Sequence, residues 1–588
     1  MKKNAAELAV YALEQLGIRH TFGIPGVHNT ELYDALNNST QIKPVLVTHE
    51  GGAAFMADGV SRSADWHQHR PKEIGVLVIV PAAGFTHAAS GIGEAFLDGI
   101  PMLVISGGIR TDTGRRFQLH GIDQLQLAKP ITKAAYRINH QSEVIETLYQ
   151  AYQLATSGKP GPVLVEIPVN LQLFKESVPA PMPYSQFLED MAKPENSDLS
   201  TLTEQALQLL SAANKPAMFV GWGARHAKQQ LVQLAEKLQM PVATTLQGLA
   251  SFPHQHPLHA GFGFSPSAVP AAQYAFADCD VLLAIGTRFS EIPTGSFSAE
   301  VPDNLIHVDI DDSVFNQNYP AKVAIPADAL EFTDALLEQM ADSAARSPDQ
   351  TLVKGIKKRK ADYQQSWLDH DSGDRVNPAH FFNRLRKASA DDAITVLDDG
   401  NHTFLTAELY PLSSKARLLT PTDFNAMGYA VPAAIGAQFT QPEKQVFAIV
   451  GDGCFLMTCM EISTAVSHAL GVIYFIFNDG ELSQIAQAQQ IPYNRKPCTQ
   501  LGPINFEGVA QATGAGYLEI SNNDAIEEAI QNALKTAAKG VPVIVNVAID
   551  YSKQTAFTAG TARTTFSRFP LKQRLRIGAR AIARKLSG

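Results

Sequence analysis

Cysteine is scarce in this sequence, since 588 residues include four cysteines. Their spacing matches neither a zinc ligand set nor the paired pattern of a disulfide framework. We therefore expect reduced thiols that are core or near-core residues, and a cytoplasmic setting. The four are Cys279, Cys454, Cys459 and Cys498.

Long apolar runs and a basic excess are also missing. No apolar run reaches transmembrane length. The first 17 residues carry Asn4, Glu7 and Glu14 among apolar residues at helical spacing, which predicts a first domain helix rather than a signal peptide. The net charge of −9 argues against nucleic acid as the main partner.

What the sequence does contain is an alternation of helix and strand patterns, with 45% hydrophobic residues. This alternation predicts an α/β protein with parallel sheets, and the length predicts three or four domains. The stretch after Ser177 is rich in proline and Asp342–Gln350 is polar, so both are linker candidates, whereas Ser63–Glu73 is expected to be a surface loop. The expected domains are residues 1–180, 195–345 and 375–555, followed by a basic tail at 562–588.

One stretch near the end of the third expected domain predicts a βαβ unit. Gln445–Val450 and Val472–Phe477 are short apolar runs typical of buried parallel strands. Apolar residues from Met460 to Ala469 recur at helical spacing, and Gly471 is expected to end that helix.

Asp452 and Asn478 follow the two strands of this unit directly. They should lie at the carboxyl edge of the sheet, where open α/β sheets bind ligands. Oxygen ligands of this kind suit Mg²⁺. The turn at Gly451 and Gly453 offers backbone N–H groups at a helix start, which suits a phosphate. Together they predict a diphosphate anchored through a metal.

The Gly-Asp-Gly…Asn spacing resembles the cofactor motif of thiamine diphosphate enzymes. Thr422–Ala437 resembles the segment upstream of that motif, Val47–Arg62 the catalytic-glutamate segment, and Phe22–Leu36 the first strand-loop-helix. The likeness runs in collinear order over roughly residues 4–550. The chain resembles the acetolactate synthase-like superfamily, which also holds pyruvate oxidases, benzoylformate decarboxylases and oxalyl-CoA decarboxylases. The resemblance implies three doubly wound parallel-sheet domains (pyrimidine-binding, middle and diphosphate-binding), with the first and third sharing one fold.

The resemblance also implies the residues that bind thiamine diphosphate. Glu50 matches the family glutamate that activates the aminopyrimidine, and Met427 matches the apolar residue that wedges the cofactor into its bent shape. Asn425 stands where a backbone carbonyl accepts from the cofactor amino group. Asn401 and His402 match positions that contact the diphosphate; a core or capping role is the alternative for His402.

The metal ligands implied by the resemblance are Asp452, Asn478 and the carbonyl of Gly480. The residue after Asn478 is usually a second asparagine, and here it is Asp479. Because the first asparagine carries the ligation, the substitution leaves the expected Mg²⁺ site in place.

Four polar residues are further candidate catalytic residues that would face the substrate. His28 follows "FGIPG", His87 lies where the superfamily often has His or Asn, Gln118 lies in a loop with His120, and Gln484 replaces a typical hydrophobic residue. Each alone is as well explained as a surface or packing residue. Together they indicate a polar pocket able to move protons near neutral pH.

A second cofactor is left open by the middle domain. Gly221, Gly223, Arg225 and Arg288 match family positions that accompany FAD. However, the family lysine is replaced in "QGLAS" and the Met-His-Gly stretch is absent from "GFGFSPSAV". Structural FAD, bound ADP and an empty site are three open states, with FAD the less favoured.

The tail at 562–588 is basic, with eight Lys or Arg and no acid. Leu571, Leu575, Ile582 and Leu586 form an apolar stripe at helical spacing. Such a helix either packs on this protein or a partner subunit, or lies on an anionic membrane, as the C-terminal helix of some pyruvate oxidases does. Peripheral contact at the inner face of a membrane is thus an alternative to a purely cytoplasmic setting.

The main functional prediction is a thiamine diphosphate- and Mg²⁺-dependent decarboxylase and carboligase acting on a 2-oxo acid or diketone, assembled as a homodimer or homotetramer. One alternative is a carbon–carbon hydrolase resembling cyclohexane-1,2-dione hydrolase, which His28 and Gln484 favour. An alternative of another class is a noncatalytic scaffold that retains the fold. The intact set of Glu50, Asp452 and Asn478 argues against the scaffold.

Overall fold

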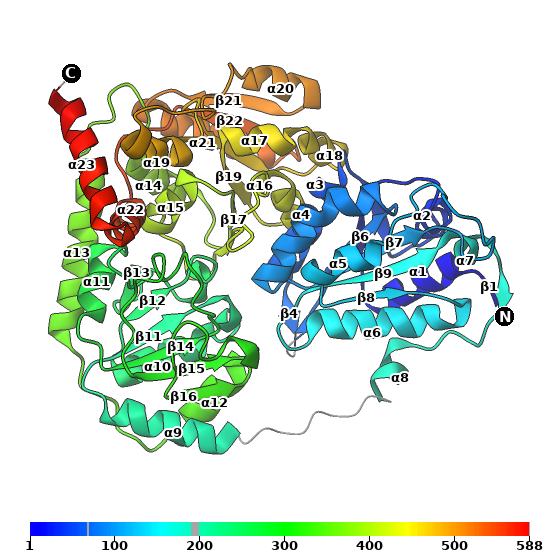
Figure 1. The fold of residues 1–588 in the computed structure, drawn as a ribbon, viewed down its shortest axis with the longest axis horizontal. Helices are drawn as coiled ribbons and strands as arrows, with labels where there is room; N and C mark the ends of the chain where they lie inside the picture. Colours follow the sequence, from blue (N-terminus) through cyan, green and yellow to red (C-terminus); the bar gives the residue numbers. More distant parts are fainter. Residues whose placement is uncertain (68–69, 190–198, 587–588) are drawn as a thin grey trace.

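The computed structural model describes residues 1–67, 70–189 and 199–586 (Figure 1). Three α/β domains follow one another along the chain, each built on a six-stranded sheet. In Figure 1 the first domain lies on the right, the middle domain at the lower left and the third domain at the upper left. The expected α/β class with three parallel-sheet domains is confirmed.

The first domain has the strand order β3-β2-β6-β7-β9-β8, with every pair parallel. Its central strands are buried on both faces because helices cover both sides, which explains their unbroken apolar runs. A short antiparallel pair joins β1 (Lys2–Lys3) to β10 (Glu176–Ser177). The main strands are β2 (His20–Gly23), β3 (Lys43–Leu46), β6 (Gly75–Ile79), β7 (Met102–Gly108), β8 (Ala134–Arg137) and β9 (Pro162–Pro168). The helices are α1 (Ala5–Gln15), α2 (Thr30–Asn37), α3 (Glu50–Ser63), α4 (Ala83–Asp98), α5 (Gln124–Ala128), α6 (Val144–Thr156) and α7 (Val169–Leu173).

The third domain repeats this topology. Its order is β18-β17-β19-β20-β22-β21, so strands numbered within each domain run 2-1-3-4-6-5 in both, and the expectation of one shared fold is confirmed. The strands are β17 (Ile394–Leu397), β18 (Arg417–Leu419), β19 (Val446–Gly451), β20 (Ile473–Phe477), β21 (Gly516–Ile520) and β22 (Val543–Val547). The helices are α14 (Pro378–Ala388), α15 (Asn401–Leu409), α16 (Ala430–Thr440), α17 (Asp452–Thr458), α18 (Ile462–Ser467), α19 (Ser483–Tyr493), α20 (Phe506–Thr513) and α21 (Ile526–Ala537).

The middle domain differs, with the order β13-β12-β11-β14-β15-β16. Numbered within the domain this is 3-2-1-4-5-6, the order of the dinucleotide-binding folds. The strands are β11 (Pro216–Val220), β12 (Val242–Thr244), β13 (His259–Phe262), β14 (Val281–Ile285), β15 (Asn304–Asp309) and β16 (Val323–Pro326). The helices are α9 (Leu199–Ala212), α10 (Lys228–Leu238), α11 (Pro270–Phe276) and α12 (Ala329–Gln339).

Between the domains the structure differs from the linker expectations. The proline-rich stretch contains α8 (Tyr184–Glu189), and the polar stretch runs into the long helix α13 (Gln350–Leu368). The expected surface loop at 63–73 forms an antiparallel pair, β4 (Trp66–His67) with β5 (Arg70–Pro71), and residues 68–69 of that expectation lie outside the described residues. The expected start of the middle domain at residue 195 also lies outside them.

The helix expected from Met460 to Ala469 is broken. The 3-10 turn Cys459–Glu461 separates α17 from α18, and α18 ends at Ser467. The left-handed residue behind it is Ala469 (φ 52°), so Gly471 is not the helix-ending glycine. A Cβ at Gly471 would lie 1.9 Å from the Ala537 carbonyl oxygen, so a close approach of α21 requires glycine there.

The first and third domains of one chain pack together through α3 and α16. A Cβ at Gly59 would lie 2.2 Å from the Ala433 carbonyl oxygen, and one at Gly436 would lie 2.0 Å from the Met56 carbonyl oxygen. These two glycines therefore allow the helix backbones to touch. All of α3 is buried, which explains its Gly- and Ala-rich sequence.

The basic tail is helical, as expected, forming α22 (Ala556–Arg568) and α23 (Leu571–Leu586). Figure 1 shows α23 in red at the edge of the molecule, and it contacts α19 of the third domain. Leu571 and Leu575 are 64% exposed, so the N-terminal half of the stripe is not covered in the single chain. Among the described residues, no helix combines the length and apolar character needed to cross a membrane.

Candidate active site

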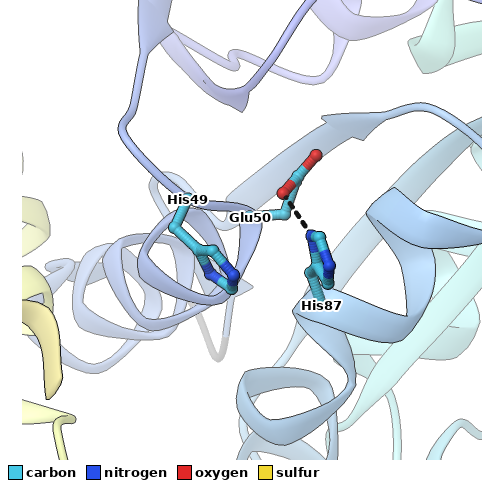
Figure 2. A group of neighbouring side chains, drawn as sticks. All are labelled: His49, Glu50 and His87. Atoms are coloured by element: carbon cyan, nitrogen blue, oxygen red, sulfur yellow. Dashed lines mark hydrogen bonds and ion pairs between the residues drawn. The ribbon is translucent and has the colours of Figure 1, made fainter.

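Glu50 begins α3 and lies in a small cluster with His49 and His87 (Figure 2). His49 caps the helix, its Nδ1 accepting from the Gly51 N–H at 3.0 Å. The His87 Nδ1, from the first turn of α4, lies 3.0 Å from the Glu50 Oε2. The rings of His49 and His87 stack with centroids 4.7 Å apart. Glu50 is 8% exposed, so its carboxyl has one imidazole partner in a largely dry setting.

The start of α3 is fixed by a residue of the third domain. The Glu461 carboxylate accepts from the backbone N–H of His49 at 3.0 Å and from that of Thr48 at 3.2 Å. A Cβ at Gly52 would lie 2.2 Å from the Glu461 Oε1, so glycine is required for this contact. Burial raises the pKa of Glu461. The loop before Glu50 is thus held by hydrogen bonds between domains.

The structure brings His28 and His120 together, with ring centroids 5.0 Å apart. His28 is buried, and its pKa is lowered by burial and then by the neighbouring charge of His120. The Gln118 side chain donates to the Arg110 carbonyl at 2.8 Å and so stabilises its own loop. Phe117 beside it is fully exposed. The substrate roles of His28, His87 and Gln118 stay predictions.

A second cluster surrounds an open cavity of about 570 Å³ in the third domain, at the carboxyl ends of β17, β19 and β20. In the part of the chain that the structure describes, its lining comes from residues 399–551 alone. Asn425, Asn478 and Gly480 are not among its lining residues but are close to them in sequence. Seven of the candidate cofactor and substrate residues do line it: Asn401, His402, Met427, Gly451, Asp452, Gly453 and Gln484.

Asp452 connects the two turns at this edge of the sheet. Its Oδ1 accepts from the Gly453 N–H at 2.7 Å, and its Oδ2 accepts from the Gly480 N–H at 2.7 Å and the Asp479 N–H at 3.2 Å. Burial raises the pKa of Asp452. The Asn478 side-chain nitrogen donates to the Asn546 Oδ1 at 3.1 Å. This hydrogen bond occupies the amide nitrogen and not the oxygen, which is the atom that a metal would bind.

Asp479 adds a second carboxylate beside Asp452. One of its oxygens accepts from the Ser483 hydroxyl, and the buried Oδ1 has no partner among the described residues. Burial, with the nearby charge of Asp452, raises the pKa of Asp479 to about 6. Two carboxylates, an amide and backbone carbonyls around one cavity are the ligand types that Mg²⁺ takes, so the residues fit a divalent cation.

His402 forms another part of the wall. A Cβ at Gly400 would lie 2.8 Å from its ring and one at Gly451 would lie 3.0 Å away, so both glycines are needed to admit the imidazole. Burial lowers the pKa of His402 to about 3, which keeps the ring neutral. Its buried Nε2 has no partner among the described residues. A neutral ring nitrogen and the N-terminus of α17 together fit a phosphate.

The turn that carries Met427 is shaped by Asp398 and Asp399. Asn425 has a left-handed backbone (φ 60°), and its side chain donates to the Asp399 Oδ1 at 2.8 Å. The Asp398 carboxylate accepts from the Gly428 N–H at 2.9 Å. These bonds hold the half-buried Met427 at the cavity wall.

Sequence reasoning missed three residues that organise the site: Glu461, His49 and Asp398. The positions of His49, directly before Glu50, and Asp398, directly after a buried strand, were available signals. Glu461 gives no local signal, because its partners lie more than 400 positions away in the chain.

The middle domain borders a further cavity of about 790 Å³, lined by Gly223, Arg225 and Arg288 among others. Arg288 forms an ion pair with Asp423 and donates to the Leu97 carbonyl. Burial raises the pKa of Asp309, another lining residue, to about 6. Three of the four residues matched to FAD positions therefore line a cavity, and Gly221 is not among its lining residues.

Comparisons with known proteins agree with this geometry. Residues 3–127 match the N-terminal TPP binding domain of thiamine pyrophosphate enzymes, residues 203–336 their central domain and residues 398–547 their C-terminal TPP binding domain. The chain is 31% identical over 553 residues to the acetolactate synthase isozyme 1 large subunit of Escherichia coli, covering 93% of this chain and 94% of that protein. It is 29% identical over 556 residues to the isozyme 3 large subunit of the same organism, with coverage of 94% and 95%. It is 31% identical over 568 residues to an acetolactate synthase large subunit of Corynebacterium glutamicum, with coverage of 94% and 88%.

Proposed function

The chain belongs to the thiamine pyrophosphate enzyme family, among enzymes like acetolactate synthase, and we propose that it is a thiamine diphosphate- and Mg²⁺-dependent decarboxylase and carboligase acting on a 2-oxo acid or diketone. The observation that carries the proposal is the cavity at the carboxyl ends of β19 and β20, where Asp452 receives the backbone N–H groups that follow Asn478. This is the geometry in which a metal can bridge a diphosphate to both turns.

The residues would divide the binding as follows. Asp452, Asn478 and the Gly480 carbonyl would hold Mg²⁺, while Asn401 and the neutral His402 ring would contact the diphosphate. The turn at Gly451 and Gly453, at the start of α17, would lie against the same phosphate, and the Gly453 N–H, which donates to the Asp452 Oδ1 here, would have to turn toward it to bind. Met427 and the Asn425 carbonyl would orient the aminopyrimidine end.

When bound, thiamine diphosphate supplies a thiazolium carbon that attacks carbonyls. Glu50 would hold a proton at its carboxyl and share it with the aminopyrimidine nitrogen. His87, 3.0 Å from that carboxyl, would relay protons between Glu50 and the substrate. Gln484, whose buried Oε1 has no partner among the described residues, would orient substrate or product from the cavity wall.

Two reactions are open: decarboxylation followed by carboligation, or hydrolysis of a carbon–carbon bond. Which of them occurs depends on the substrate, and on whether the pocket admits a second carbonyl compound or a water molecule. The polar His28 and Gln484 favour hydrolysis as the second candidate, because a positioned water needs polar partners. Incubating the holoenzyme with a panel of 2-oxo acids and 1,2-diketones, with products identified by mass, separates the two. Absence of any product across the panel with saturating cofactor would favour the scaffold alternative.

We also propose that two chains build each site. Within the described parts of the chain, the cavity around Asp452 is lined by third-domain residues alone. Glu50 lies in the first domain. The exposed apolar residues Phe117, Leu119 and Ile122 around Gln118 offer a surface for the second chain. Size-exclusion chromatography with light scattering tests for a dimer or tetramer.

Whether FAD is bound, the less favoured of the three states of the middle domain, is tested separately by the visible absorbance of the purified protein.

A further inference from the structure

A third cavity lies where the three domains meet, apart from the candidate active site. This cavity is open to solvent, has a volume of about 1,040 Å³ and is lined by residues of all three domains. Lys72 comes from the first domain, Arg225 and Lys228 from the middle domain, and Lys415 and Arg417 from the third. It shares Trp222 and Arg225 with the middle-domain cavity but takes no residue from the Asp452 cavity.

The charge of this wall is opposite to that of the chain. Asp65 is the single carboxylate on the described lining, in a protein of net charge −9. Asp65 forms an ion pair with Arg417, and one of its oxygens lies 3.8 Å from the Lys72 Nζ. A single carboxylate is thus shared by two basic side chains. A sixth basic residue, Arg62, is already neutralised because its guanidinium lies 2.6 Å from Asp58 and 3.0 Å from Asp98.

The other cations are less closely paired: the charge of Asp328 acts on Arg225, and Lys415 is exposed. The Arg225 guanidinium lies between two indole rings, 4.5 Å from the centroid of Trp222 and 4.8 Å from that of Trp66. The Lys228 Nζ donates to the Ser414 carbonyl at 2.9 Å, across the boundary between the middle and third domains.

Arg225 and Lys228 are partly withdrawn from water. Burial lowers the pKa of Arg225 to about 9 and that of Lys228 to about 8. Holding several like charges in a recess with fewer counter-charges is unfavourable, and a bound anion would offset that cost. Planar guanidinium and ammonium groups that converge on one space are the groups that proteins use for phosphates.

We propose that this cavity is a binding site for a diphosphate-containing anion, which would join the three domains through Arg225, Lys228, Lys415 and the Arg417–Asp65 pair. The site is independent of the proposed catalytic reaction. Binding would tighten the junction of the domains, because its contacts come from Lys72 of the first domain, from residues 225–228 of the middle domain and from residues 415–417 of the third.

Tryptophan fluorescence gives a direct readout. Two of the three tryptophans, Trp66 and Trp222, line the cavity, whereas Trp367 is fully buried elsewhere. The test titrates inorganic diphosphate, at constant free Mg²⁺, into holoenzyme already saturated with thiamine diphosphate, so the Asp452 site is filled. Saturable change in emission is expected, with affinity that falls as NaCl rises because charge interactions are screened.

Lys228→Gln should weaken diphosphate binding about tenfold or more, since it removes a charged contact. Lys228→Arg should retain binding, and Lys358→Gln, which changes an exposed lysine of α13, should leave it unaltered. A parallel titration with ADP distinguishes the sources of the anion: tighter binding of ADP than of diphosphate would assign a nucleotide, and equal affinity would assign the phosphates alone. The proposal is overturned if calorimetry detects no binding of either anion, or if Lys228→Gln binds as wild type does while remaining folded by thermal melting.

Discussion

The carboxylate of Glu461 accepts a hydrogen bond from the backbone N–H of His49 at 3.0 Å, and so links the 3-10 turn Cys459–Glu461 of the third domain to the residue that precedes Glu50. The same carboxylate also bonds the Thr48 N–H and the Thr464 hydroxyl. An acid that accepts from both backbone N–H groups directly before α3 should fix the position of the Glu50 side chain. The arrangement makes the geometry of the first domain depend on the third.

Glu461→Ala should therefore lower both stability and turnover. Losing two hydrogen bonds from backbone N–H groups to a carboxylate costs on the order of 2 kcal/mol in the free energy of unfolding. Turnover should fall while thiamine diphosphate affinity changes little, because the variant disturbs Glu50 and not the Asp452 cavity. Urea unfolding and saturating-cofactor kinetics measure the two effects. The exposed Glu146→Ala is the matched control, and equal behaviour of the two variants would contradict the positioning role.

Glu50→Gln should reduce turnover about 10²–10⁴-fold, the range for loss of an acid–base group. The amide cannot hold the exchangeable proton, but it is nearly isosteric and contributes little to holding a diphosphate. Thiamine diphosphate affinity by calorimetry should therefore stay within a few-fold of wild type. A variant with wild-type rate at saturating cofactor would remove Glu50 from the mechanism.

Asp452→Ala should lose the cofactor itself. The change removes a carboxylate that both faces the cavity and organises the Asp479 and Gly480 turn. The loss in affinity for thiamine diphosphate in Mg²⁺ buffer should exceed about 100-fold, since even removal of groups behind a metal ligand costs 10–100-fold. Asp479→Asn is the comparison, because it retains an oxygen for Ser483 and should keep most of the affinity. Unchanged affinity in Asp452→Ala would refute the metal assignment.

Acid sensitivity should arise partly from His254 in the middle domain. Burial lowers its folded-state pKa to about 4, and one ring nitrogen bonds the Leu249 carbonyl at 2.9 Å. The unfolded chain, with an ordinary value near 6.5, binds the proton first, so stability is lost as pH falls below about 6.5. Between pH 7.5 and 5 this amounts to about 2 kcal/mol. His254→Gln should remove that part of the pH dependence in urea unfolding, and an unaltered slope would contradict it.

Some of this site follows from the sequence and some does not. The β19-to-β20 unit was predictable because apolar strands and a Gly-Asp-Gly turn are local signals, and they fix which edge carries Asp452 and Asn478. The break at Cys459–Glu461 was not, because the apolar spacing continues through it and the Glu461 contacts are with another domain. Gly471 is a second example of a contact that the sequence does not reveal. Its position suggests a glycine that ends a helix, whereas the structure requires glycine there because the Ala537 carbonyl oxygen lies so close.

The sharing of each site between two chains predicts that two inactive variants restore activity when mixed. Glu50 and Asp452 belong to separate domains, each with its own sheet, and the described lining of the Asp452 cavity holds no first-domain residue. A mixed dimer of Glu50→Gln and Asp452→Ala chains would then contain one site with both changes and one site with neither. With free exchange at equal ratio, about half of the dimers are mixed, so roughly a quarter of wild-type activity should return if the sites act independently. Labelled chains verify that exchange has occurred. Failure to recover activity after verified exchange would mean that each site is completed within a single chain, and that closure of the first domain onto the third brings Glu50 to the cofactor.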